Sequence, residues 1–102
     1  MILKENEIKD KDLREFWVSG GRKTAGLGAD KVKRLKSLLV HLDTARSLND
    51  IASGLGELRE FHKLSGFDCR YALSVTGNYR ITFNCEDAST GVVTDIEYED
   101  YH

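Results

Sequence analysis

Proline is absent from this chain of 102 residues, and methionine and tryptophan occur once each. The sequence also has no internal repeat, no low-complexity stretch and no long run of apolar residues. The last absence excludes a transmembrane helix, which needs about 20 consecutive apolar residues. The first ten residues, MILKENEIKD, lack the apolar segment of a secretory signal peptide, so we expect a cytoplasmic protein with no membrane partner.

Cysteine is nearly absent as well, since Cys69 and Cys85 are the only two. They have neither the spacing of a zinc site nor that of a dithiol redox motif. We expect both to be reduced, buried thiols, because an unpaired cysteine behaves as a small apolar residue. No cofactor is predicted.

The remaining composition is that of an ordinary globular protein, with 40% hydrophobic and 31% charged residues. A chain of this length can bury one modest core, so we expect a single domain over residues 1–102. The net charge of −2 is unevenly spread: residues 22–36 hold six basic residues and one acidic residue, whereas residues 86–102 hold six acidic residues and no Lys or Arg. The basic segment could face phosphates, including those of DNA, and the acidic segment a basic partner, or both could be solvated surface.

Two amphipathic helices are predicted in the N-terminal half. Over residues 9–17, Leu13, Phe16 and Trp17 have helical spacing. Over residues 29–43 the apolar repeat is longer, and Asp30 stands near its start, where an acidic residue favours a helix. That repeat consists of Val32, Leu35, Leu38, Leu39 and Leu42. The glycine-rich string SGGRKTAGLG joins the two helices, and residues 44–56 predict a turn followed by one more helical turn.

From residue 58 onwards the pattern changes to alternation, which is typical of strands. The predicted strands are LREFHKL (58–64), CRYALSV (69–75), RITFNC (80–85) and VVTDIEYED (92–100). Gly77 and Asn78 predict a tight hairpin between the second and third. On the last strand we expect Val92, Ile96 and Tyr98 to share the apolar face. Helices followed by an antiparallel meander define an α+β fold.

Four strings in this order resemble the HigB family of toxins, the plasmid-maintenance killer proteins within the RelE superfamily. They are IKDKDLREFW, KRLKSLLVHLDTARSLNDI, FHKLSG and YALSVTGNYRITFNCED, and the chain closes on DYH as members of that family do. Within them, NYRITF is the most specific string. The resemblance implies a RelE-like fold, a small twisted antiparallel sheet with two N-terminal helices packed on one face.

The resemblance also implies a function, that of the toxin of a type II toxin–antitoxin system. Such a toxin is an endoribonuclease that cleaves mRNA in the A site of the 70S ribosome. Its partner would be a HigA-type helix-turn-helix antitoxin, which would itself supply any DNA binding. After FHKL this chain has SGFDC where many members have a basic stretch. That departure leaves open an alternative, a catalytically weak or inactive RelE-like module that acts by binding an antitoxin or regulator.

RNA cleavage without a metal uses the 2′-hydroxyl as nucleophile, and it needs a base, an acid and positive charge at the phosphate. His62 and His102 are the candidate acid–base pair, in either order. Arg80 is the candidate phosphate clamp, because its planar donors match two phosphate oxygens. Asp100 could orient a histidine, raise its pKa or take the proton itself. Tyr101 could stack on a base, hold the phosphate or cap the core.

Further basic residues are candidates for RNA contact. They are Lys63, Arg70, Lys31, Lys33 and Arg34. Two of the catalytic candidates also have structural interpretations, since Arg80 could be an ordinary surface arginine and His62 a partly buried structural histidine. A metal site built from His62, Asp100 and His102 is possible by ligand type, but it lacks a recognised spacing, so the metal-free site is the prediction.

Overall fold

Helices precede strands along the chain in the computed structural model, which describes residues 3–100. The order is η1 (Glu5–Glu7), α1 (Lys11–Val18), α2 (Val32–Thr44), α3 (Leu48–Ala52), α4 (Leu55–Leu58), β1 (His62–Lys63), β2 (Arg70–Ser74), β3 (Tyr79–Asn84) and β4 (Thr94–Asp100). The four strands form an antiparallel sheet in the order β1-β2-β3-β4, which confirms the predicted α+β class. No helix within residues 3–100 is long and apolar enough to cross a membrane.

Helix α1 forms as its sequence predicts. The Asp10 carboxylate accepts a hydrogen bond from the backbone N–H of Leu13 at 2.8 Å, which satisfies a donor that the first helical turn leaves unpaired. Leu13 and Phe16 are buried, and Trp17 packs against the core. After the helix, Gly20 has a φ of +69°, a conformation that favours glycine.

Helix α2 carries the predicted leucine repeat, and its four leucines at 35, 38, 39 and 42 are fully buried. Its start differs from the prediction, because the helix begins at Val32 and has no side-chain cap. The Asp30 carboxylate lies instead 3.4 Å from the ammonium of Lys31. The apolar stripe therefore determines where α2 forms. The first turn of α2 contains no acidic residue, contrary to the expectation for Asp30.

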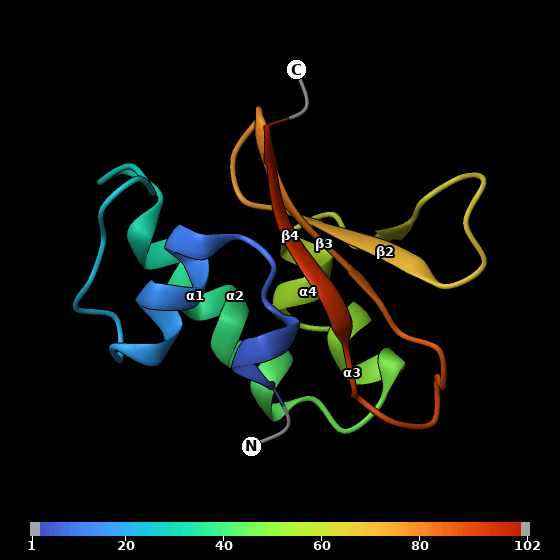
Figure 1. The fold of residues 1–102 in the computed structure, drawn as a ribbon. Helices are drawn as coiled ribbons and strands as arrows, with labels where there is room; N and C mark the ends of the chain where they lie inside the picture. The colour runs from blue at the N-terminus through green and yellow to red at the C-terminus, as the bar shows by residue number, and fades with distance from the viewer. Residues whose placement is uncertain (1–2, 101–102) are drawn as a thin grey trace.

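The core lies between the helices and one face of the sheet, with α1 and α2 to the left of the strands in Figure 1. Leucines of α1 and α2 join the same cluster as Leu73, Ile81, Phe83 and Ile96 of the sheet. We call the opposite side of the sheet the open face. By register it carries His62, Arg70, Ala72, Ser74, Arg80, Thr82, Asn84, Glu97 and Glu99.

The strand predicted over residues 58–64 is mostly wrong. Leu58 is the last residue of α4 and is 75% exposed, and only His62 and Lys63 form a strand. A tight turn follows the helix, in which the N–H of Phe61 donates to the carbonyl of Gly56 at 2.9 Å and Glu60 has a φ of +54°. The alternating pattern at 58–61 is thus part of a helix end and a turn.

The β2–β3 hairpin forms as Gly77 and Asn78 predict. The N–H of Val75 donates to the carbonyl of Tyr79 at 2.9 Å and closes the loop. Away from the hairpin turn, the rings of Tyr71 and Phe83 stack on the core side of the sheet, with their centroids 6.1 Å apart.

Strand β4 contains a bulge that the sequence pattern did not predict. Asn84 pairs with Thr94, whereas Thr82, two residues earlier, pairs with Glu97, three residues later. One extra residue is therefore inserted in β4. Asp95 has a φ of +47°, the left-handed conformation that a bulge can require.

The bulge changes which residues of the last strand face the core. Val93 and Ile96 are buried, whereas Val92 is 45% exposed and precedes the strand. The expected shared face of Val92, Ile96 and Tyr98 is therefore wrong at Val92, because the alternation does not continue through Asp95. The same shift places Glu97 and Glu99 on the open face.

Gly56→Ala should destabilise the fold, because a Cβ at this position would lie 1.9 Å from the carbonyl oxygen of Ile51. We expect a loss of about 2 kcal/mol in the free energy of unfolding, measured by urea denaturation. Gly77→Ala is the matched control, since a Cβ there meets nothing within 4 Å. Equal effects of the two substitutions would contradict this packing.

Tyr98 should make the protein sensitive to alkaline pH. Burial, followed by the nearby Tyr79, Asp10, Asp30 and Asp100, raises the pKa of Tyr98 to about 12. The unfolded chain releases this proton near pH 10, so the folded state binds more protons between about pH 10 and pH 12 and loses stability as the pH rises through that window. Denaturation midpoints should fall less steeply there in Tyr98→Phe, whereas Tyr71→Phe should follow the unsubstituted protein.

Candidate functional site

The register of the sheet brings His62 and Arg80 to the open face. His62 lies opposite Ala72 on the neighbouring strand, and Ala72 lies opposite Thr82 of β3. Arg80 lies opposite Ser74 of β2 and Glu99 of β4. Directly opposed residues share a face, and the backbones of β1 and β3 are two strand spacings apart, roughly 10 Å. Long side chains can span that separation.

The His62 side chain is exposed, which does not fit the structural interpretation of this residue. Its Nδ1 lies 2.8 Å from the carbonyl oxygen of Glu60. A carbonyl only accepts hydrogen bonds, so Nδ1 carries the proton in this contact. The neutral ring therefore has its lone pair on Nε2, where it can accept a proton.

Arg80 is held in place by an ion pair across the β3–β4 ladder. Its Nε and Nη2 atoms lie 3.3 and 3.2 Å from Oε1 of Glu99. The other oxygen of that carboxylate accepts a hydrogen bond from the hydroxyl of Thr82 at 2.7 Å. Because Glu99 is itself anchored, it fixes the position of the Arg80 guanidinium on the open face.

Arg70 does not fit the predicted role of an RNA contact, because its side chain is buried within the open face. The residue is 8% exposed. One terminal nitrogen donates to Oδ1 of Asn84 at 2.9 Å and to the carbonyl of Asp95 at 3.1 Å. The other donates to Oγ1 of Thr82 at 2.8 Å and to Oε2 of Glu97 at 2.6 Å. The structure thus makes Arg70 a residue that joins β2 to β3 and β4.

The C-terminal candidates are placed only in part. Asp100 lies opposite Tyr79, whose ring packs on the core side, so the register puts Asp100 on the face away from Arg80. Tyr101 and His102 lie outside the described residues. Strand β4 nevertheless runs to the end of the sheet at which β3 begins, next to Arg80.

The basic residues at the start of α2 lie near that same end. The Lys31 ammonium is 4.4 Å from the centroid of the Tyr79 ring. Arg34 donates to the carbonyl of Val75 at 3.1 Å, and Arg59 donates to the same carbonyl at 3.4 Å. Lys33 and Lys63 are exposed, on α2 and β1. The tip of the β2–β3 hairpin therefore has cationic side chains around it, and Arg59 is one that sequence reasoning missed.

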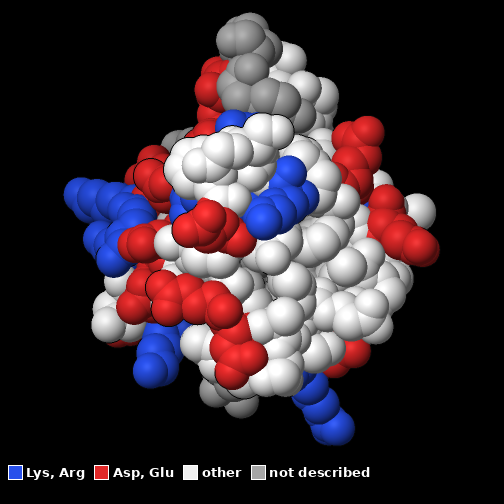
Figure 2. All heavy atoms as spheres, turned by 90° about the vertical axis from the view of Figure 1, so that its right-hand side faces the viewer, with Lys and Arg blue, Asp and Glu red and all other residues white. Residues whose placement is uncertain are grey.

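Sequence reasoning also missed the two glutamates that face the arginines. Glu97 and Glu99 alternate with Ile96 and Tyr98, a pattern that could have indicated carboxylates on the face opposite the core. By their ion pairs they match the positive charge of the two open-face arginines. Figure 2 views the molecule from the right of Figure 1 and shows acidic side chains gathered on this side with basic ones between them.

Metal ligands are not clustered in the described part of the chain. Among residues 3–100, no three His, Cys, Asp or Glu side chains are grouped so that they could hold a metal ion. The metal site considered from the sequence requires His102, which lies outside this range.

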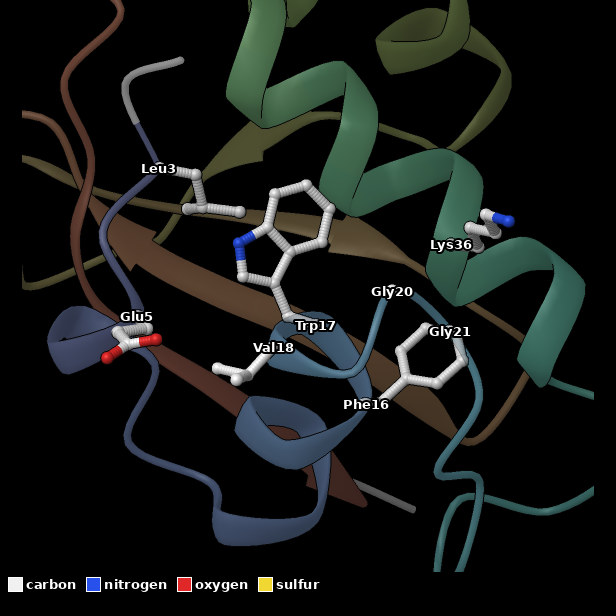
Figure 3. A pocket seen from close by; sticks show the side chains of 8 residues that line it. All are labelled: Leu3, Glu5, Phe16, Trp17, Val18, Gly20, Gly21 and Lys36. Carbon is white, nitrogen blue, oxygen red and sulfur yellow. The ribbon is translucent and has the colours of Figure 1, made fainter.

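An apolar groove lies on the other side of the molecule from the open face. It has a volume of about 530 Å³ and lies beside α1 and α2, where Phe16, Trp17 and Val18 form an apolar wall (Figure 3). Its only ionisable lining residues among those described are Glu5 and Lys36. The groove contains none of the predicted catalytic or RNA-binding residues, so it is not the predicted site.

Sequence comparison identifies no relative that would assign a function to the open face. No protein-family model matches the chain, and no curated protein matches it.

Arg70→Ala should destabilise the fold, because it removes a buried cation with four acceptors around it. Since its partner Glu97 is half-exposed, with 53% of the side chain accessible, we expect a moderate cost of about 2 kcal/mol. In calorimetry this corresponds to a decrease in Tm of roughly 8 °C or more. Lys63→Ala, at an exposed position, should change Tm by less than about 2 °C. A similarly small effect for Arg70→Ala would show that the network contributes little.

Proposed function

We propose that this protein is the toxin of a type II toxin–antitoxin system, with a RelE-like fold and a metal-free endoribonuclease activity on ribosome-bound mRNA. The observation that supports this proposal most strongly is the register of the sheet, which presents His62 and Arg80 on one face that the helices do not cover. The antiparallel sheet with helices on its other face is compatible with the expected fold. The proposed partner is a HigA-type helix-turn-helix antitoxin.

In the proposed reaction the RNA lies across the open face with a phosphate beside Arg80. A base takes the proton of the 2′-hydroxyl, and the freed oxygen attacks the adjacent phosphorus. The bond to the 5′-oxygen breaks, and an acid protonates that leaving oxygen. The products are a 2′,3′-cyclic phosphate and a 5′-hydroxyl. Arg80 stabilises the negative charge that develops on the phosphorus oxygens.

The hydrogen bond of His62 favours one of the two possible role assignments. With the proton on Nδ1, donated to Glu60, the neutral ring accepts a proton at Nε2. After proton transfer the imidazolium keeps the same bond to the carbonyl. We therefore assign the base to His62 and the acid to His102.

Glu99 has a positioning role in this scheme. It holds the Arg80 guanidinium at 3.2 Å before any RNA binds, and Thr82 holds Glu99 in turn. A positioned cation needs less reorganisation when the charge develops than a mobile one. The ion pair also lowers the net charge of the site, so it favours orientation at the expense of long-range attraction.

A second function is favoured by the same pairs. Both arginines of the open face are matched by carboxylates, and a face without excess positive charge attracts nucleic acid weakly. Such a face suits a segment of a protein partner better than it suits RNA. The second candidate is therefore a RelE-like module that binds an antitoxin or regulator and cleaves no RNA.

Induced expression in a bacterial host distinguishes these functions. The toxin should arrest growth, and mapping of mRNA 5′ ends should reveal cuts within codons. His62→Gln and His102→Ala should each lower the cleavage by about 100-fold or more, the contribution typical of acid–base groups. His41→Gln is the matched control, since the His41 ring bonds the carbonyl of Ile51 at 2.9 Å and glutamine can keep that bond.

Circular dichroism of each variant checks that the fold is retained. Growth arrest that persists in both the His62 and the His102 variants would contradict the proposed chemistry. If the folded, unsubstituted protein arrests no growth and cuts no mRNA, the binding module is the better assignment.

A further inference from the structure

The two cysteines, 16 positions apart in the sequence, face each other across the β2–β3 hairpin. The N–H of Cys85 donates to the carbonyl of Cys69 at 2.9 Å. The adjacent residues, Arg70 and Asn84, are opposed in the register of the two strands. Cys69 and Cys85 therefore extend the ladder by one pair, and their side chains lie on the same face of the sheet.

This position suits a disulfide. Hydrogen-bonded pairs in antiparallel sheets have Cα atoms about 5.5 Å apart, within the range of roughly 4.4–6.8 Å found for disulfides. Both residues are free thiols in this structure. Their proximity has an electrostatic effect too, because Cys69 contributes to the raised pKa of Cys85, after burial and Asp87.

The two thiols differ in accessibility. Cys69 is partly exposed at the end of the segment that joins β1 to β2. Cys85 is 3% exposed, and its sulfur lies 3.6 Å from the carbonyl oxygen of Asp87 and 3.7 Å from that of Thr90. A reagent in solution can therefore reach Cys69 more readily than Cys85. Cys85 is placed to react with a mixed disulfide formed on Cys69.

We propose that Cys69 and Cys85 form a reversible disulfide across the two strands when the protein meets a small disulfide such as oxidised glutathione. The Cys69 thiolate attacks one sulfur of the reagent, which forms a mixed disulfide and releases one glutathione thiolate. The Cys85 thiolate then attacks the sulfur of Cys69, and the second glutathione thiolate leaves. The protein loses two electrons and two protons, and the reagent becomes two molecules of reduced glutathione.

The disulfide would link the start of β2 to the end of β3 and enclose the hairpin between them. It would also fix one end of residues 64–68, the segment that follows β1. Closing a loop of this length removes conformations from the unfolded chain, so the oxidised protein should be more stable than the reduced one. This inference does not depend on the proposed nuclease activity.

The test equilibrates the native protein with glutathione at graded ratios of the oxidised and reduced forms, then quenches it with an alkylating reagent. Mass spectrometry of the digested protein should find a Cys69–Cys85 peptide link, and a non-reducing gel should show a monomer. The Tm should rise by roughly 5–10 °C and return after treatment with dithiothreitol.

Two variants separate the steps. Cys85→Ser should stop at a mixed disulfide with one glutathione on Cys69, and Cys85→Ala repeats this test if serine destabilises the buried site. Cys69→Ser should react at least about 10-fold more slowly, because its remaining thiol is buried. In the unsubstituted protein, a lasting mixed disulfide, a dimer linked through cysteine, or two unreacted thiols under conditions that modify Cys85→Ser would each overturn the proposal.

Discussion

The buried guanidinium of Arg70 is the interaction on which the open face depends. It joins three strands, because it bonds to Asn84 and Thr82 of β3 and to Glu97 of β4 from its own position on β2. A buried cation without such acceptors would be costly. The residues around Arg70 are therefore constrained by its charge as well as by their own packing.

A continuous chain of polar contacts spreads from this point across the sheet. Thr82 accepts a hydrogen bond from Arg70 and donates one to Glu99, and Glu99 holds Arg80. The sequence of contacts thus runs Glu97–Arg70–Thr82–Glu99–Arg80. In a chain of this kind each bond polarises the next, so the partly buried guanidinium of Arg80 is oriented by the buried one of Arg70. Thr82 is fully buried, and its hydroxyl connects Arg70 to Glu99.

The local sequence pattern was enough to predict the two long helices and the hairpin, but not the bulge in β4 or the short length of β1, the two edge strands of the sheet. The leucines of α2 and the pair Gly77–Asn78 determine structure by their own spacing and conformation. The bulge at Asp95 could not be predicted in this way, because it is defined by the pairing with Asn84 and Thr82 on another strand. The alternation from Leu58 to Phe61 does not identify a strand, because four alternating residues look the same in a strand and in a helix end followed by a turn.

The same distinction applies to the site. His62 and Arg80 could be selected from residue type and resemblance, but only the register of the sheet shows that they share a face. The burial of Arg70 could not be anticipated, since its partner Glu97 lies 27 positions away in the sequence. The opposition of Cys69 and Cys85 likewise follows from hairpin register rather than from the spacing that identifies redox motifs.

Strand β4 lies at the edge of the sheet, and the N-terminal segment covers part of that edge. Ile8 forms a parallel bridge with Ile96, and the N–H of Lys9 donates to the carbonyl of Ile96 at 2.8 Å. Uncovered edges invite other chains to add a strand, which is a common start of aggregation. The segment before α1 therefore protects the edge of β4 from pairing with another chain. Its loss would make the molecule prone to self-association through β4.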